Sequence, residues 1–148
     1  KLRGPSYHPQ NYFKKFHQAN NKKISQSNGQ IDWLTTDEKE RVKYLKDPMT
    51  HFAYTVQGYK DIVDVIKEVN SIEMIKKIPN YLSVYIGAGK NDPLAKGIEK
   101  LIDKYKQQGI KDLTYQVFDE MRHSLLFEKE KSVVYQNILD WLEERTYL

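Results

Sequence analysis

One stretch constrains the fold of this chain most: an apolar, β-rich run at residues 82–88 that ends in a glycine turn. An almost uninterrupted apolar run of this length is typical of a strand buried on both faces, as in parallel sheets. Gly87 and Gly89 leave room for a tight backbone turn, and Asp92 follows within it, directly before a proline. The stretch therefore predicts a buried strand with a carboxylate just past its carboxyl end.

The sequence around this strand alternates between helical and strand patterns. Residues 113–117 alternate between apolar and polar side chains, as a second strand does, and Glu128 is expected to cap or charge the start of the last helix. The order helix, strand, helix, strand, helix predicts an α/β fold. Two strands are too few for a stable parallel sheet, so we expect part of the fold to lie outside this chain. Apolar residues at helical spacing cover residues 59–69, 72–77, 98–105 and 134–142.

The first third of the chain differs from the rest, because it is polar, irregular and rich in large aromatic side chains. Residues 18–30 predict an exposed loop. Thr35 and Glu38 have the spacing of a capping box, so a short helix should follow and end before the next proline. We therefore divide the chain into a first region, residues 1–55, and a second region, residues 56–148.

The composition limits the classes of function. With 148 residues, 39% of them apolar and 30% charged, the chain is long enough for one modest globular domain. It contains no cysteine, which excludes disulfides and thiolate metal sites. The net charge of +4 is spread over lysines among 20 acidic residues, so we expect a solvated surface and no nucleic-acid partner. His8, His17 and His51 are too scattered for a metal site, and we expect no metal or other cofactor.

Asp92 and His123 are the candidate catalytic residues. His123 lies a few residues past the second predicted strand, as Asp92 lies past the first. If the strands are parallel neighbours, both side chains project from the edge of the sheet where ligands of open α/β sheets bind. A carboxylate there can accept a hydrogen bond from the imidazole Nδ1–H, which leaves the other nitrogen to act as a general base. Each residue also has an ordinary structural reading, since an aspartate before proline is common turn chemistry.

The order of these features resembles a known family. Residues 85–145 read as a strand, a glycine-containing turn with Asp-Pro, a helix, a short strand, Arg-His and a closing Ile-Leu-x-Trp-Leu helix. This resembles the carboxyl-terminal half of an α/β-hydrolase of the monoacylglycerol lipase and lysophospholipase type. Earlier stretches at residues 2–7, 31–49 and 51–62 resemble that family's cap and the chain leaving it. The resemblance implies an α/β fold made of the last two core strands with their helices, plus a helical cap, or lid, at residues 1–55.

Carried over to this sequence, the resemblance makes Asp92 the acid and His123 the base of a Ser-His-Asp triad, in the chain order known for this fold. The nucleophile motif Gly-x-Ser-x-Gly does not occur in the chain, and the surroundings of Ser6 fit it poorly. We therefore expect the nucleophile and the oxyanion hole in an amino-terminal half of the same hydrolase, as the partner of this chain. The chain alone should then be inactive, because it would form no acyl-enzyme.

The resemblance also implies a substrate class: esters with a single acyl chain, such as monoacylglycerol or lysophospholipid. Trp33, Phe52 and Tyr54 are the candidate substrate contacts in the cap, although such aromatic residues more often form its core. Two alternatives stay open: a carboxylesterase or aminopeptidase on the same fold, and a non-catalytic lipid-binding or regulatory module. The expected location is cytoplasmic, with export left open and at most transient contact with a membrane surface.

Overall fold

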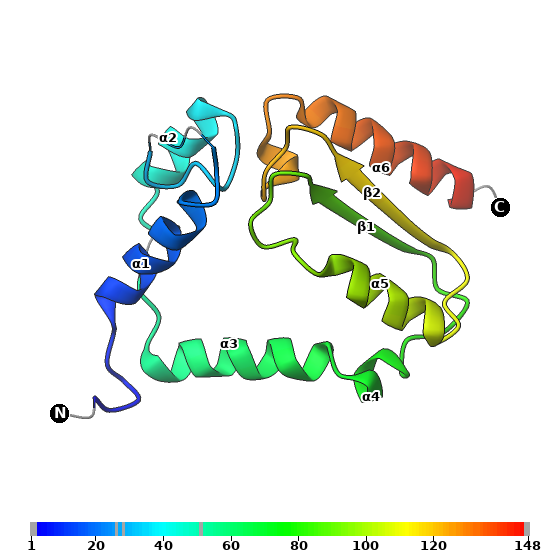
Figure 1. Ribbon diagram of the computed structural model, residues 1–148, viewed down its shortest axis with the longest axis horizontal. Coiled ribbons are helices and arrows are strands. Elements are labelled where there is room, and N and C mark those ends of the chain that lie inside the picture. The colour runs from blue at the N-terminus through cyan, green and yellow to red at the C-terminus, as the bar shows by residue number, and fades with distance from the viewer. Residues whose placement is uncertain (1–2, 26, 28, 51, 147–148) are drawn as a thin grey trace.

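The structure is a computed structural model that describes residues 3–25, 27, 29–50 and 52–146. His51, one of the histidines considered above, lies outside the described residues. Figure 1 shows an α/β unit of β1, β2, α5 and α6, which α3 and α4 connect to the region of α1 and α2. In chain order the elements are α1 (Gln10–Asn21), α2 (Glu38–Lys46), α3 (Val56–Val69), α4 (Ile72–Ile75), β1 (Val84–Gly89), α5 (Ile98–Gln107), β2 (Leu113–Phe118), the 3₁₀-helix η1 (Leu125–Phe127) and α6 (Lys131–Thr146).

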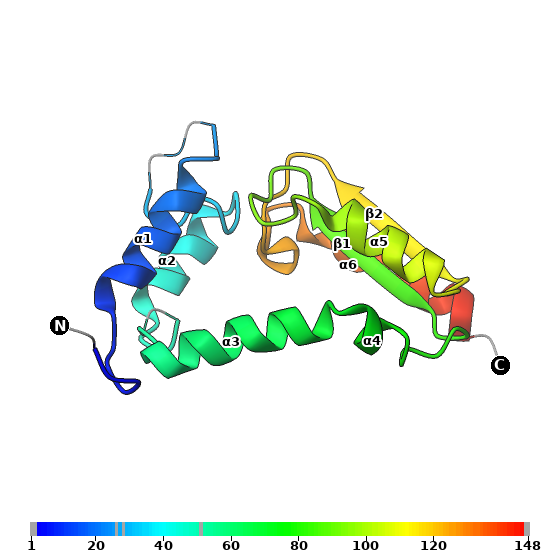
Figure 2. The same ribbon diagram turned by 60° about the horizontal axis from the view of Figure 1, so that its bottom comes forward.

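β1 and β2 pair in parallel, which confirms the arrangement expected from the sequence. Val84 pairs with Leu113 and Gly89 with Phe118, so the two strands start and end level with each other. α5 and α6 lie on opposite faces of this sheet (Figures 1 and 2). Both arrowheads point towards α1 and α2 (Figure 1), so the carboxyl ends of the strands face the first region of the chain.

Polar contacts attach the carboxyl-terminal part of α6 to the start of β2. Trp141 donates its indole N–H to the Thr114 hydroxyl at 2.9 Å. Near the carboxyl end of the helix, the Arg145 guanidinium binds both carboxylate oxygens of Asp112, at 2.7 and 2.8 Å. These bonds from Arg145, together with a hydrogen bond from the Ser83 side chain, lower the pKa of Asp112 to about 2. The amino end of β2 is thereby fixed to α6, and the opposite end carries the candidate site.

Two buried apolar clusters border the carboxyl edge of the sheet. The first packs β2 against α6, and the second joins the segment after α1 to α2, with Ile24 and Tyr44 at its margin. The turn after β2 lies where the two regions meet, because the backbone N–H of Ser124 donates to the Leu34 carbonyl oxygen. The first cluster contains Phe118, Met121 and Val134, and the second contains Ile31, Trp33 and Leu34.

α1 is a helix that the sequence analysis did not predict. It extends to Asn21, so the expected loop at residues 18–30 starts only after that residue. No side-chain cap precedes the helix and its first turn has no acidic residue, so the usual sequence signals of a helix start are missing. Aromatic contacts hold it instead: Phe16 and His17 each pack against Trp33, with ring centroids 5.7 Å apart in both pairs.

The capping-box prediction for α2 is wrong. Asp37 is the N-cap, and its carboxylate accepts hydrogen bonds from the backbone N–H groups of Lys39 and Glu40. Thr35 donates its hydroxyl proton to the carbonyl oxygen of Phe127 at 2.8 Å. A tertiary contact with the end of η1 has therefore drawn Thr35 away from the local capping role that its spacing indicated.

The described residues leave apolar surface uncovered. Val84 to Gly87 of β1 are half-buried, so the expected strand buried on both faces is only partly covered here. α3 exposes an apolar stripe that includes Ile62, Ile66 and Val69. Among the described residues no helix is long and apolar enough to cross a membrane. The division of the chain at residue 55 stays a prediction.

Candidate catalytic site

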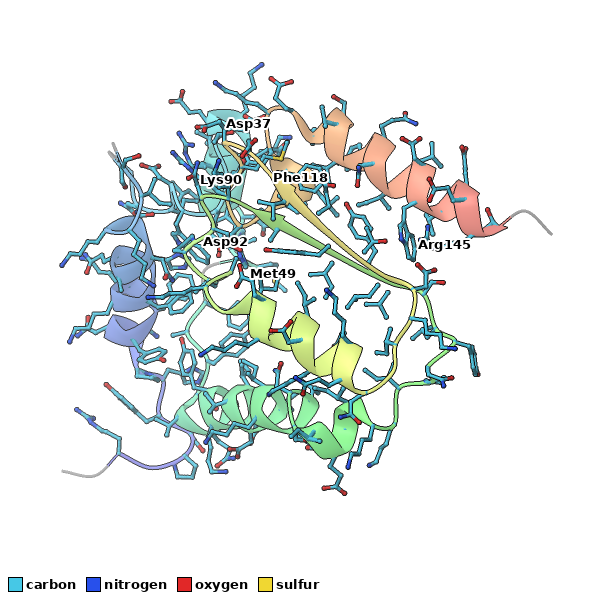
Figure 3. All side chains as sticks on the ribbon, turned by 45° about the vertical axis from the view of Figure 1, so that its right-hand side comes forward. Asp37, Met49, Lys90, Asp92, Phe118 and Arg145 are labelled. Carbon is cyan, nitrogen blue, oxygen red and sulfur yellow. The ribbon has the colours of Figure 1, made fainter. Side chains whose placement is uncertain are left out.

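Asp92 lies in a tight turn directly after β1. Its backbone N–H donates to the carbonyl oxygen of Gly89 at 3.0 Å, and its Oδ1 accepts the backbone N–H of Leu94 at 2.8 Å. Figure 3 shows Lys90 and Asp92 past the carboxyl end of β1, at the same end of the sheet as Phe118. Arg145 lies towards the opposite end. The turn thus fixes one carboxylate oxygen and aims the other away from its own backbone.

Gly89 allows the turn after β1 to approach the turn after β2. A Cβ atom at this position would lie 2.2 Å from the carbonyl oxygen of Arg122 and 2.5 Å from that of Met121. The backbone N–H of Asn91 donates to the same Met121 oxygen at 2.9 Å. The absence of a side chain at residue 89 therefore lets the two turns share backbone contacts.

His123 meets Asp92 across these two turns. The distance from His123 Nδ1 to Asp92 Oδ2 is 3.0 Å. The side chain of Asp92 is 10% exposed and that of His123 is 40% exposed, so the acid is screened and the imidazole is accessible. In this geometry the carboxylate accepts a hydrogen bond from Nδ1–H, which holds the ring in the tautomer whose Nε2 can accept a proton.

The indole of Trp33 packs against the imidazole of His123. The ring centroids are 5.0 Å apart, and the backbone N–H of His123 points to the Trp33 carbonyl oxygen at 3.4 Å. Trp33 is itself fixed, because its backbone N–H donates to Asn21 Oδ1 at 2.9 Å and its indole N–H donates to His17 Nδ1 at 3.0 Å. Burial lowers the pKa of His17, which favours the neutral ring that this acceptor role requires.

The predicted cap residues gather around one cavity of about 460 Å³ that also includes His123. Trp33, Phe52 and Tyr54 all line it. The rings of Phe52 and Tyr54 pack edge to face, with centroids 4.8 Å apart, and both residues are exposed, whereas Trp33 is buried. Trp33 is therefore core and cavity wall at once. The cavity is mainly aromatic and aliphatic, with further walls from Tyr12, Phe13, Phe16, Met49, Tyr59, Ile62 and Ile66.

Two residues near His123 make hydrogen bonds that the sequence did not predict. Arg122 donates from its guanidinium to the carbonyl oxygen of Asp32 at 2.6 Å. Glu128, expected to cap the last helix, instead turns inwards and accepts the backbone N–H of Arg122 at 2.7 Å. Its burial could not be predicted from the sequence, because a glutamate three residues before the first residue of a helix is readily explained as a cap of that helix.

The other residues considered in the sequence lie away from the Asp92–His123 site. Ser6 sits in an exposed turn before α1, and the described residues before it, 3–5, form no strand. It is not among the residues that line the cavity with His123. His8 directs Nδ1 to the carbonyl oxygen of Ala53 at 2.8 Å. Within the described part of the chain, no group of three or more potential ligands is arranged to hold a metal ion.

The fold is shared with solved esterases and lipases. A thermostable carboxyl esterase from Bacillus coagulans, solved with glycerol, matches with a TM-score of 0.81 and 18% identity, over 95% of this chain and 47% of its own. A lipase in an open form matches with a TM-score of 0.79 and 17% identity, over 95% of this chain and 47% of the lipase. Monoglyceride lipase from Saccharomyces cerevisiae, solved with a substrate analogue, matches with a TM-score of 0.63 and 22% identity, over 94% and 52%.

The chain spans about half the length of these solved structures. No curated protein matches it. The family described as serine aminopeptidase, S33, matches residues 4–130, which is most of the chain. Because the match covers both regions, the chain belongs to this serine aminopeptidase S33 family. Its parallel strands and flanking helices form part of an α/β-hydrolase fold.

Proposed function

We propose that this chain supplies the acid and base of the catalytic triad of a serine hydrolase that cleaves carboxylic esters. The observation that carries the proposal is the 3.0 Å contact between His123 Nδ1 and Asp92 Oδ2 at the carboxyl edge of a parallel sheet. Membership of a serine hydrolase family supports it. Asp92 and His123 are thus proposed as catalytic residues.

In the proposed reaction, His123 Nε2 takes the proton of a serine hydroxyl as the oxygen attacks the ester carbonyl. Asp92 keeps the Nδ1 proton in place and stabilises the imidazolium that forms. His123 then returns the proton to the leaving alcohol, and a water molecule repeats the cycle on the acyl-enzyme. We propose that the serine and the oxyanion hole come from an amino-terminal half of the same hydrolase, since Gly-x-Ser-x-Gly is not found in these 148 residues.

We further propose that the substrate carries a single acyl chain, as in monoacylglycerol or lysophospholipid. The support is the cavity next to His123, because its walls are aromatic and aliphatic side chains that suit a hydrocarbon chain. Trp33, Phe52 and Tyr54 would contact that chain. A glycerol or phosphoglycerol head group would then lie towards the polar turns that carry Asp92 and His123.

The family description gives a specific reason to keep an aminopeptidase as the second candidate. A peptidase of that kind must bind the free ammonium group of its substrate, which a carboxylate does best. Among the described residues that line the cavity with His123 there is no aspartate or glutamate. The lining therefore favours the ester of an acyl chain over a peptide with a free amino terminus.

A chain-length series on the full-length protein that contains this chain tests the proposal. We expect hydrolysis of nitrophenyl esters to rise from acetyl to long acyl chains, and expect monoacylglycerol to be cleaved faster than aminoacyl nitroanilides. Asp92→Asn and His123→Ala should each lower kcat by about 10⁴-fold or more. Preference for acetyl esters would contradict the substrate class, faster cleavage of the nitroanilides would favour the peptidase, and near-normal turnover in both variants would remove the triad assignment.

A further inference from the structure

A buried glutamate is in contact with the turn that carries His123. Glu128 is only 1% exposed, although a carboxylate is costly to bury unless donors satisfy it. Its Oε1 accepts the backbone N–H of Arg122 at 2.7 Å, and its Oε2 accepts the backbone N–H of Thr36 at 2.8 Å. The Thr36 hydroxyl also donates to Oε2, and the Thr35 hydroxyl lies 3.2 Å from it.

These contacts join two segments that are far apart in sequence. Arg122 directly precedes His123, and Thr36 belongs to the short segment between the buried Trp33 and helix α2. On the other side of His123, the backbone N–H of Ser124 donates to the Leu34 carbonyl oxygen at 2.7 Å. The backbone of His123 is therefore held against residues 33–36 from both sides, and Glu128 supplies the link on the amino-terminal side.

The turn that carries His123 depends on such links, because it has little regular structure of its own. β2 ends at Phe118 and η1 begins only at Leu125. Glu120, within this gap, adopts a positive φ of 59°, a conformation that few residues other than glycine take up readily. A displacement of about 1 Å in such a turn would separate Nδ1 from the Asp92 carboxylate, and misplacements of that size can cost about 10²-fold in rate.

We infer that Glu128 is a positioning residue for His123: it holds the turn at residues 121–124 against residues 33–36, so that Nδ1 stays within hydrogen-bonding distance of Asp92. The inference rests on the proposed function, since it assigns a role in the same catalytic site. Glu128 acts through the backbone of Arg122 and through Thr36, and it does not contact the reacting atoms.

Two variants of the full-length hydrolase weaken this link to different degrees. Glu128→Gln keeps the shape, but each carboxylate oxygen accepts a backbone N–H, so the amide NH₂ must face one of these donors in either orientation. We expect kcat to fall about 10- to 100-fold with KM changed less than about twofold. Thr36→Val removes the hydroxyl donor alone and should give a smaller loss of kcat, whereas Thr36→Ser keeps that donor and should restore it.

A matched control separates positioning from general stability. Thr114→Val removes the acceptor of the Trp141 indole N–H, a side-chain hydrogen bond between β2 and α6. It should lower the unfolding temperature without lowering kcat. In proton NMR spectra, the downfield Nδ1–H resonance of His123 should weaken or shift in Glu128→Gln and stay in place in Thr114→Val.

The outcomes distinguish this inference from the proposed function. If Glu128→Gln and Thr36→Val lose stability but keep the wild-type kcat and the His123 resonance, Glu128 is structural only and the inference is wrong. If Glu128→Gln does not fold, the Thr36 variants give the test: a lower kcat in Thr36→Val that Thr36→Ser restores supports the positioning role, and a wild-type kcat in both overturns it. If the wild-type protein hydrolyses no ester, yet Glu128→Gln still loses the His123 resonance, the proposed function fails and the positioning role stands.

Discussion

At the scale of single residues, position 89 admits no side chain. A Cβ there would lie 2.2 Å from a backbone carbonyl oxygen of the neighbouring turn, and backbone yields less readily than a flexible side chain. The approach of the two turns is also what brings Asp92 to His123. Stability and site geometry therefore depend on the same glycine.

We predict that Gly89→Ala destabilises the protein by about 2 kcal/mol or more, because the added methyl group forces the two turns apart. Urea unfolding of the full-length protein measures this change. Gly4→Ala is the matched control, since a Cβ at residue 4 meets nothing within 4 Å, and it should change stability by less than about 0.5 kcal/mol. Equal stability of both variants would show that the turns can separate without cost.

At the scale of elements, the pair of Arg145 with Asp112 fixes α6 to the start of β2. Hydrogen bonds from Arg145, with a smaller contribution from Ser83, lower the pKa of Asp112 from 3.8 to about 2 in the folded protein. A carboxyl whose pKa is lowered by folding stabilises the native state above its unfolded pKa, and this stabilisation is lost as the pH falls towards the folded pKa. The contribution of the pair should therefore vanish between pH 3.8 and about 2.

Asp112→Asn should lower the urea midpoint at neutral pH, because the ion pair is lost. The difference from the wild type should stay constant above about pH 5 and shrink as the pH falls below about 4. Arg145→Gln should show the same pH dependence, since it removes the other half of the pair. A difference that is independent of pH across this range would mean that the ion pair contributes nothing and that only packing is lost.

The elements that the sequence predicts well are those with strong internal patterns. β1, β2, α3, α5 and α6 were expected near their observed positions, because apolar periodicity reports which face is buried. α1 was missed because its stability comes from contacts with Trp33, which lies after the loop that follows the helix. Asp92 and His123 could be paired from sequence because parallel strands end at one edge, whereas the inward turn of Glu128 depends on Thr36, 92 residues away in sequence.

At the scale of the whole molecule, the described residues form an incomplete apolar core. β1 is half-buried, and α3 and the start of α4 expose Val65, Val69 and Ile72, none of which lines the cavity with His123. Exposed apolar side chains that adjoin one another are typical of a surface that packs against another segment. We predict that the 148-residue chain, prepared alone, binds the apolar dye ANS and cleaves no ester, and that the full-length protein binds little ANS. Strong ester cleavage by the chain alone would contradict a nucleophile outside it.

Asp92 and His123 are proposed to serve a serine that lies outside these 148 residues. Labelling of the full-length protein with a fluorophosphonate, followed by mass mapping of the adduct, locates that serine. We expect one stoichiometric adduct on a serine outside this chain, formed at least about 10³-fold more slowly in His123→Ala. An adduct on a serine within the chain, such as Ser6, or unchanged labelling of His123→Ala, would overturn the triad assignment.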